Sequence, residues 1–210
     1  EPLSSLDEPI SRRLRGDLDR LFETLDVPVV YVTHDQRTAT ALADRIAILR
    51  DGAVAQVGTP TDVLEHPASR FVAEFTGNEN VFEIRIGTDE NGRHGHVGNT
   101  ALRSEGESGA LPWLDSPSAV SAVTVCVHPS RIDFREISSS EKPAYQIPVI
   151  VERWLHENDT YRVFARVAGG PVLTATMSRM AFERLEFSRG EETTATIPVD
   201  SIHVLERVTR

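Results

Sequence analysis

An apolar, β-branched run near the start of this chain ends abruptly in a titratable pair. The run spans Val29–Thr33 (VVYVT), and His34 and Asp35 follow it directly. Such a run is typical of a strand that is buried on both faces in a parallel sheet. In open α/β sheets, ligands bind beyond the carboxyl ends of the strands, where a histidine can reach a phosphate. The run therefore predicts an α/β unit in which His34 contacts phosphate.

The composition restricts the function classes to which the chain can belong. It has 210 residues and a formal net charge of −10, and neither half offers the basic face that nucleic-acid binding requires. The longest wholly apolar run, Val27–Val32, is far shorter than the roughly 20 residues of a membrane-spanning helix. Cys126 is the single cysteine, which excludes an intrachain disulfide and predicts a buried thiol. We therefore expect a cytoplasmic protein that does not bind nucleic acid.

Residues 1–77 alternate between helical and strand patterns. Between residues 8 and 26, apolar side chains recur at helical spacing, on Leu14, Leu18, Leu21, Phe22 and Leu25. The elements expected next are a strand over 27–33, a helix over 36–43, strands over 45–50 and 54–57, and two short helices capped by Thr59 and Ser69. Asp51-Gly52 predicts a hairpin turn between the last two strands. The alternation indicates α/β architecture.

From residue 78 onward, the pattern changes to short strands separated by turns. Strands are expected over 81–86, 120–127, 146–153, 161–167, 172–176, 193–198 and 202–205. A loop is expected over 104–118, hairpin turns at 91–92 and 169–171, and one short helix over 179–187 that Gly190 ends. Many short strands with one helix predict a small β-barrel. We place the boundary at 77–80, which gives an α/β domain over 1–77 and a mainly-β domain over 78–210.

Four segments of the first domain occur in the order and spacing of one known family. They are Glu1–Asp7 (EPLSSLD), Tyr31–Gln36 (YVTHDQ), 43–60 with its ADRI, DG and QVGTP sequences, and 70–78 with RFVAEF and GN. Residues 1–77 thereby resemble the C-terminal third of the ATPase of an importer-type ATP-binding-cassette (ABC) transporter. The first segment resembles the end of the Walker B strand and the D-loop, and the second resembles the switch-histidine segment, or H-loop. The resemblance implies the C-terminal part of a P-loop NTPase domain.

The resemblance implies catalytic roles for two titratable side chains. Glu1 matches the glutamate after the Walker B aspartate, a general base that orients the attacking water. His34 matches the switch histidine, which hydrogen-bonds the γ-phosphate of ATP and senses its loss. The alternatives are a surface acid for Glu1 and a structural histidine at a strand end for His34.

The D-loop match assigns four further residues. In the family, this loop couples the two ATP sites across a dimer of ATPase subunits. The matching residues here are Ser4, Ser5, Leu6 and Asp7. The same residues form a helix-entry pattern that predicts an N-cap, and the two roles are compatible.

Other parts of an ATP site are absent from the sequence. It contains no G-x-x-x-x-G-K-[ST] loop, glutamine loop or signature motif, and the Walker B aspartate would precede Glu1. We therefore expect a fragment of a longer protein that binds ATP and Mg²⁺, whereas this segment alone binds neither and holds no metal. The resemblance implies as partners a paired ATPase subunit or homodimer, transmembrane permease subunits and, indirectly, a solute-binding receptor. It places the protein on the cytoplasmic face of the cell membrane.

Residues 78–208 resemble the transport-associated OB-like (TOBE) domain of such importers. The similar parts are Val125–Ile132 (VCVHPSRI) and the tail from Ser178 to Ile202. In relatives this domain mediates dimer contacts and can bind a regulator or the transported anion. Ser178 and Arg179, at a predicted helix start, are the candidate anion-binding residues, against the alternative of a capped helix with a solvated arginine.

Two closely spaced histidines suggest a metal site, because histidine is a common metal ligand, but the sequence around them argues against one. His94 and His96 flank Gly95, but no cysteine or nearby carboxylate cluster completes a ligand set. We therefore favour a polar loop and assign no metal here.

The leading hypothesis is the C-terminal portion of the ATP-hydrolysing subunit of an ABC importer, which couples hydrolysis to solute uptake through a permease. The alternative is a non-catalytic regulatory or dimerisation module that binds a small anion. The solute stays open among molybdate or tungstate, sulfate, iron, polyamine and sugar, because selectivity lies mainly in the receptor and permease.

Overall fold

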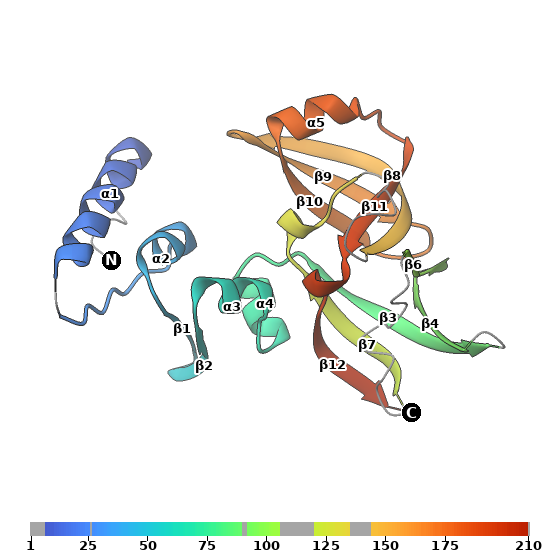
Figure 1. The fold of residues 1–210 in the computed structure, drawn as a ribbon, viewed down its shortest axis with the longest axis horizontal. Coiled ribbons are helices and arrows are strands. Elements are labelled where there is room, and N and C mark those ends of the chain that lie inside the picture. The colour runs from blue at the N-terminus through green and yellow to red at the C-terminus, as the bar shows by residue number, and fades with distance from the viewer. Residues whose placement is uncertain (1–6, 26, 90–91, 106–119, 135–143, 210) are drawn as a thin grey trace. The chain divides into compact units, whose positions relative to one another are not determined.

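The computed structural model describes residues 7–25, 27–89, 92–105, 120–134 and 144–209. The chain divides into two compact units, Glu1–Ala68 and Ser69–Arg210, and each is described here by itself (Figure 1). This division lies ahead of the 77–80 boundary drawn from the sequence, because the helix of residues 70–75 groups with the C-terminal unit. The sequence boundary was drawn where the pattern changes from helices and strands to short strands. The division into units depends instead on which segments contact one another in space.

The N-terminal unit is built from short, locally specified elements. They are α1 (Glu8–Thr24), α2 (Gln36–Leu42), β1 (Ile46–Arg50), β2 (Ala53–Gly58) and α3 (Pro60–Glu65). The amphipathic pattern correctly predicts α1, which has a proline in its first turn, where a missing N–H costs nothing. The Ala-rich stretch forms α2, also as predicted.

The turn and cap chemistry of this unit follows its sequence. Asp51 and Gly52 have φ angles of 51° and 79°, as both central residues of a type I′ turn require, and β1 and β2 pair antiparallel around them. Thr59 and Asp62 form a capping box, in which each side chain accepts the other's backbone N–H. The predicted hairpin and the predicted N-cap at Thr59 are therefore confirmed.

The predicted strand over 27–33 is wrong for this structure. These residues enter no ladder, and Val30 and Val32 are 89% and 67% exposed. Among the described residues of this unit, β1 and β2 form the only sheet. A parallel strand gains its stability from neighbouring strands on both sides, and no such neighbour pairs with this segment here.

The C-terminal unit is mainly β. Its described elements are α4 (Arg70–Phe75), β3 (Asn80–Asp89), β4 (Gly92–Val97), β5 (Thr100–Ala101), β6 (Arg103–Glu105), β7 (Val120–Val127), η1 (Pro129–Arg131), β8 (Ala144–Glu157), β9 (Thr160–Val167), β10 (Val172–Ser178), α5 (Arg179–Leu185), β11 (Glu192–Pro198), η2 (Val199–Ser201) and β12 (His203–Thr209). The predicted cap at Ser69 is confirmed, since its side chain accepts the Val72 N–H. The turn predicted at 91–92 and most of the loop predicted over 104–118 lie outside the described residues.

Two antiparallel sheets enclose one core. The described strands are ordered β12-β7-β3-β4-β5 in one sheet and β10-β9-β8-β11 in the other, with β6 also pairing with β8. The largest fully buried side chains of this core are Phe134, Tyr145, Ile84, Ile147, Leu173 and Ile197. Apart from Phe134, which follows η1, they come from both sheets, so neither sheet can bury its apolar face without the other.

Asn80 joins the two sheets at the start of β3. Its Nδ2 donates to the Val127 carbonyl (3.1 Å) in one sheet and to the Thr174 carbonyl (2.8 Å) in the other. Its Oδ1 accepts the Thr174 N–H at 2.6 Å. Asn80 is 1% exposed, so these bonds satisfy groups that water cannot reach.

Two turns meet backbone to backbone at another point of the same unit. The N–H of Asn99, in the β4–β5 turn, donates to the Ala168 carbonyl in the β9–β10 turn (2.9 Å). Gly98 has a φ of 60°, and a Cβ there would lie 2.6 Å from the Cα of Gly170. Glycine is therefore required at residue 98 both by conformation and by space.

Helix α5 lies on the β8–β9 hairpin through aromatic side chains. The Phe182 ring stacks on that of Tyr161, with centroids 4.0 Å apart, and Leu185 packs against the core. The helix ends at Glu186, which adopts the left-handed conformation with a φ of 49°, and not at Gly190 as the sequence predicted. The Gly190 N–H instead donates to the Val151 carbonyl, which ties the following turn to β8.

Candidate functional site

Of the residues predicted for the ATP site, the structure describes Asp7 and His34. Glu1, Ser4, Ser5 and Leu6 lie outside the described residues. Asp7 occupies the N-cap position of α1, and its carbonyl accepts the Ser11 N–H at 2.9 Å. Its side chain makes no capping hydrogen bond, so Asp7 occupies the predicted N-cap position without the side-chain bond of a cap, and its negative charge still suits the helix N-terminus.

His34 lies in a bend between segment 27–33 and α2. Its side chain is exposed, at the position where the chain turns into the helix. The neighbouring Thr33 hydroxyl accepts the Asp35 N–H at 3.0 Å, which fixes the backbone on either side of the histidine. The geometry therefore presents the imidazole at the surface of the unit from a defined turn.

Asp35 caps α2. Its carboxylate accepts the N–H of Arg37 at 3.0 Å and a hydrogen bond from the Thr38 hydroxyl. The Thr38 hydroxyl bond is the main cause that lowers the pKa of Asp35, and backbone N–H bonds and Arg15 add to it. Asp35 is thus held as a carboxylate that serves the helix start.

A polar cluster joins α1 to this turn, formed by Ser11, Arg15, Asp35 and Thr38, and named here the α1–α2 cluster. Arg15 Nη1 lies 3.1 Å from Ser11 Oγ, 3.5 Å from Thr38 Oγ1 and 3.5 Å from Asp35 Oδ2. The Arg15 side chain is only 13% exposed, and Ser11 and Thr38 are buried. A nearly buried guanidinium therefore connects α1 to the residue next to His34.

This arrangement gives the two members of the His34–Asp35 pair different chemistry. Asp35 is engaged by the α2 N-terminus and by Arg15, whereas the His34 side chain is exposed, and an imidazole can donate or accept a hydrogen bond. The sequence argument identified His34 but missed Arg15. One signal was available, because an acid directly before the Ala-rich stretch 36–43 predicts an N-cap at Asp35. Nothing local identifies the arginine that meets it.

The candidate anion site at Ser178 and Arg179 consists of groups that already have partners. Ser178 Oγ accepts the Ala181 N–H at 3.2 Å and caps α5. Arg179 Nε donates to Glu183 Oε1 at 2.7 Å, and this bond raises the pKa of the guanidinium. The geometry is that of a capped helix with an i,i+4 ion pair, and anion binding there stays a prediction.

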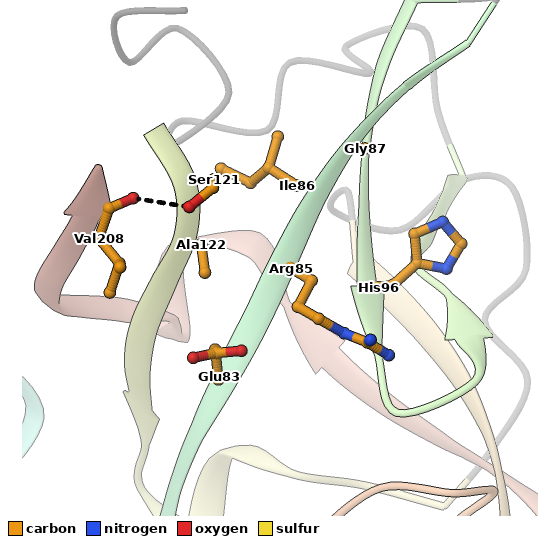
Figure 2. A pocket seen from close by; sticks show the side chains of 8 residues that line it. All are labelled: Glu83, Arg85, Ile86, Gly87, His96, Ser121, Ala122 and Val208. Carbon is orange, nitrogen blue, oxygen red and sulfur yellow. Dashed lines mark hydrogen bonds between the residues drawn. The ribbon is translucent and has the colours of Figure 1, made fainter. Parts of the chain in front are cut away.

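An open groove of about 540 Å³ lies on the sheet that contains β3 and β7 (Figure 2). Its lining residues are Glu83, Arg85, Ile86, Gly87, His96, Ser121, Ala122 and Val208. Arg85 donates to the Gly98 carbonyl and Ser121 Oγ to the Val208 carbonyl, so both polar groups support the fold. His34 is not among the residues that line this groove.

His94 and His96 belong to strand β4 and not to the loop that the sequence predicted. Their rings are in edge-to-face contact, with centroids 4.7 Å apart. Within the ranges that the structure describes, no three His, Cys, Asp or Glu side chains gather as a metal site. None of the helices described has the length and apolar content needed to cross a membrane.

Comparison with known proteins finds relatives along almost the whole chain. It is 34% identical over 210 residues to the xylose/arabinose import ATP-binding protein XacK of Haloferax volcanii, covering 98% of this chain and 51% of XacK. It is 30% identical over 207 residues to the spermidine/putrescine import ATP-binding protein PotA 1 of Pseudomonas aeruginosa, covering 98% of the chain and 52% of that relative. The chain thus spans about half the length of these relatives.

A shorter region is more similar to a third relative. The Fe(3+) ions import ATP-binding protein FbpC of Streptomyces coelicolor is 50% identical over 86 residues, which is 41% of this chain and 25% of FbpC. Among solved structures, the molybdate-bound ModG protein matches 60% of this chain and 94% of its own, with 16% identity and a TM-score of 0.44. That likeness is too low to support an argument about function.

A family model matches the second unit directly. Residues 142–204 match the TOBE domain, a region that holds β8 to β11 and α5. The segments that resembled ABC importers in the sequence and the relatives found along the whole chain agree with this match. The chain is therefore a relative of the ATP-binding subunits of ABC importers, matches about half of their length and carries a TOBE domain.

Proposed function

We propose that the protein containing this chain hydrolyses ATP and couples hydrolysis to solute uptake through a membrane permease. The observation that carries the proposal is the match to import ATP-binding proteins over 98% of the chain, together with an exposed His34 at the H-loop position. In this function, residues 1–77 are the C-terminal part of a P-loop NTPase domain, and His34 hydrogen-bonds the γ-phosphate of ATP.

The surroundings of His34 suit a phosphate ligand. An isolated carboxylate next to the histidine would repel the anion. Here the positive charge of Arg15 and the N-terminus of α2 partly compensate the negative charge of Asp35, which weakens that repulsion. The imidazole is exposed and its backbone is fixed by the Thr33 and Asp35 bonds. His34 can therefore donate one hydrogen bond to a terminal phosphate and lose it when that phosphate leaves.

Other roles in the site are proposed from the sequence match. Glu1 orients the attacking water as general base, and Ser4, Ser5, Leu6 and Asp7 couple the two ATP sites of a subunit pair. ATP supplies the γ-phosphate, and Mg²⁺ neutralises its charge during transfer. The protein acts at the cytoplasmic face of the membrane, with permease subunits as partners and a solute-binding receptor reached through them.

The solute is not specified by this region. The matched relatives are named as importers of xylose or arabinose, of spermidine or putrescine, and of Fe(3+) ions. The same C-terminal portion thus accompanies different solutes, as expected when receptor and permease select the cargo.

The substitution His34→Ala in the full-length subunit tests the function. Loss of one preorganised phosphate hydrogen bond is expected to reduce ATP turnover in the assembled transporter by about 10²-fold or more. Turnover is measured as phosphate release, with thermal unfolding to establish that the variant is folded. The control is His156→Ala, an exposed histidine of the TOBE unit that stacks on Tyr161. Turnover of the His34 variant close to that of the control would contradict the assigned role.

A further inference from the structure

The α1–α2 cluster contains an arginine whose placement the helix itself does not explain. Arg15 is in the middle of α1, yet its side chain is 13% exposed and reaches Ser11, Asp35 and Thr38. Its neighbour on the same helix, Arg13, is exposed to solvent. Removing a guanidinium from water is unfavourable unless charged and polar partners compensate for it, and this cluster provides them.

The cluster acts at the residue adjacent to His34. Asp35 is tied on one side to α2 through the Arg37 N–H and the Thr38 hydroxyl, and on the other side to α1 through Arg15. The Asp35 N–H donates to Thr33, so the backbone of the turn around His34 is bonded on both flanks. Three elements, α1, the turn and α2, therefore share one set of hydrogen bonds.

We propose that Arg15 is a positioning residue for His34, which holds the switch-histidine turn in register with the helix that follows the D-loop. This inference rests on the proposed ATPase function. One terminal nitrogen of Arg15, Nη1, lies within reach of a carboxylate and two hydroxyls, so a single side chain ties Asp35 to Ser11 and Thr38. Through this contact, a displacement of α1 also displaces the turn that carries Asp35 and His34. The helix after the D-loop and the γ-phosphate contact therefore move together.

The kinetic test compares Arg15→Ala, Arg15→Lys and the control Arg13→Ala in the full-length subunit. Misplacing a catalytic group by about 1 Å costs on the order of 10²-fold in rate, so Arg15→Ala is expected to lower kcat roughly 10- to 100-fold. The affinity for a non-hydrolysable ATP analogue should change less than about threefold. Arg15→Lys should recover part of the loss, and Arg13→Ala should behave as the unsubstituted protein.

A double variant separates positioning from a general loss of structure. If Arg15 acts through His34, Arg15→Ala combined with His34→Ala should be no slower than His34→Ala alone. An additive loss would overturn the inference, as would a kcat of Arg15→Ala that matches the Arg13 control. The same series distinguishes failure of the proposed function from failure of the positioning role. A normal rate for His34→Ala contradicts the proposed function. A slow His34→Ala variant together with a normal Arg15→Ala variant contradicts only the positioning role.

A second measurement on the 210-residue chain does not depend on activity. The Hε1 resonance of His34 in the NMR spectrum should shift or broaden in Arg15→Ala and stay in place in Arg13→Ala. The resonance of His156, in the other unit, is the internal reference and should be unchanged in both. A His34 resonance that is the same in all three proteins would refute the positioning role even if the variant is less stable.

Discussion

Asp35 shows how one carboxylate can serve a helix, an ion pair and a neighbouring ligand site. It caps α2, pairs with Arg15 and follows His34 directly. These contacts stabilise its charged form, so its pKa is lowered from the ordinary value of 3.8, chiefly by the Thr38 hydroxyl. Sequence reasoning identified the histidine because a histidine after an apolar run is a local signal. It missed Arg15, because the partner of Asp35 comes from a helix 20 residues earlier and its contact depends on packing.

The lowered pKa of Asp35 predicts an acid-dependent loss of stability in the N-terminal unit. A folded-state pKa below 3.8 means that the unfolded chain takes up the proton first. The stabilisation is therefore fully present above about pH 4 and is lost as the pH falls through the lowered pKa. Urea midpoints followed by far-UV circular dichroism at a series of pH values are expected to fall more steeply below about pH 4 for the unsubstituted chain than for Asp35→Asn. Parallel pH profiles would show that Asp35 is not the group responsible.

At the scale of elements, local chemistry was predictable and long-range pairing was not. The Asp51-Gly52 turn and the caps at Thr59 and Ser69 depend on residues within a few positions, and all three occur as predicted. The strand over 27–33 was not found. An apolar run of this kind forms a buried strand only where other strands pair with it, and no described strand pairs with these residues. The end of α5 was misplaced for another reason, since Glu186 takes a left-handed conformation that the sequence assigned to a glycine.

The turn-to-turn contact at Gly98 predicts a strong dependence on glycine. In Gly98→Ala the new Cβ would meet the backbone of Gly170, in a conformation already unfavourable for alanine. We expect the free energy of unfolding of the C-terminal unit to fall by about 2 kcal/mol or more. The matched control is Gly16→Ala in α1, where a Cβ meets nothing within 4 Å. There the substitution should stabilise the helix by about 0.5–1 kcal/mol. Equal effects of the two substitutions, measured by urea denaturation, would contradict the role of the contact.

At the scale of the whole molecule, the two units differ in how much apolar surface they bury. The buried large apolar side chains described in residues 1–68 are Ile48 and Val63, while Val27, Val29, Val30 and Val32 of that unit are exposed. The C-terminal unit buries one continuous core between its sheets. The mainly-β character of residues 78–210 was predictable from strand spacing, because each strand there finds its partners within the same region. The parallel sheet implied for residues 1–77 was not found, because no described strand of that unit lies beside 27–33.

Labelling of Cys126 can test whether the two units, which differ in buried apolar surface, also differ in stability. It is the single cysteine, is 1% exposed in β7, between β12 and β3, and burial raises the pKa of its thiol to about 12. In the native chain at pH 8, it should therefore react with an aromatic disulfide reagent only after the C-terminal unit opens. During urea titration, we expect the helical signal of α1 to decrease at lower urea than the onset of Cys126 labelling. A single transition in which both signals coincide would show that the units unfold together.

The amide of Asn80 also determines how the C-terminal unit responds to mechanical force. The chain enters the first strand of this unit at Asn80, whose side chain is bonded to Val127 in one sheet and to Thr174 in the other. A pull applied from the N-terminal side would therefore not peel β3 away one hydrogen bond at a time. The load would pass through the amide into both sheets at once, so the bonds to Val127 and Thr174 would have to break before β3 could leave.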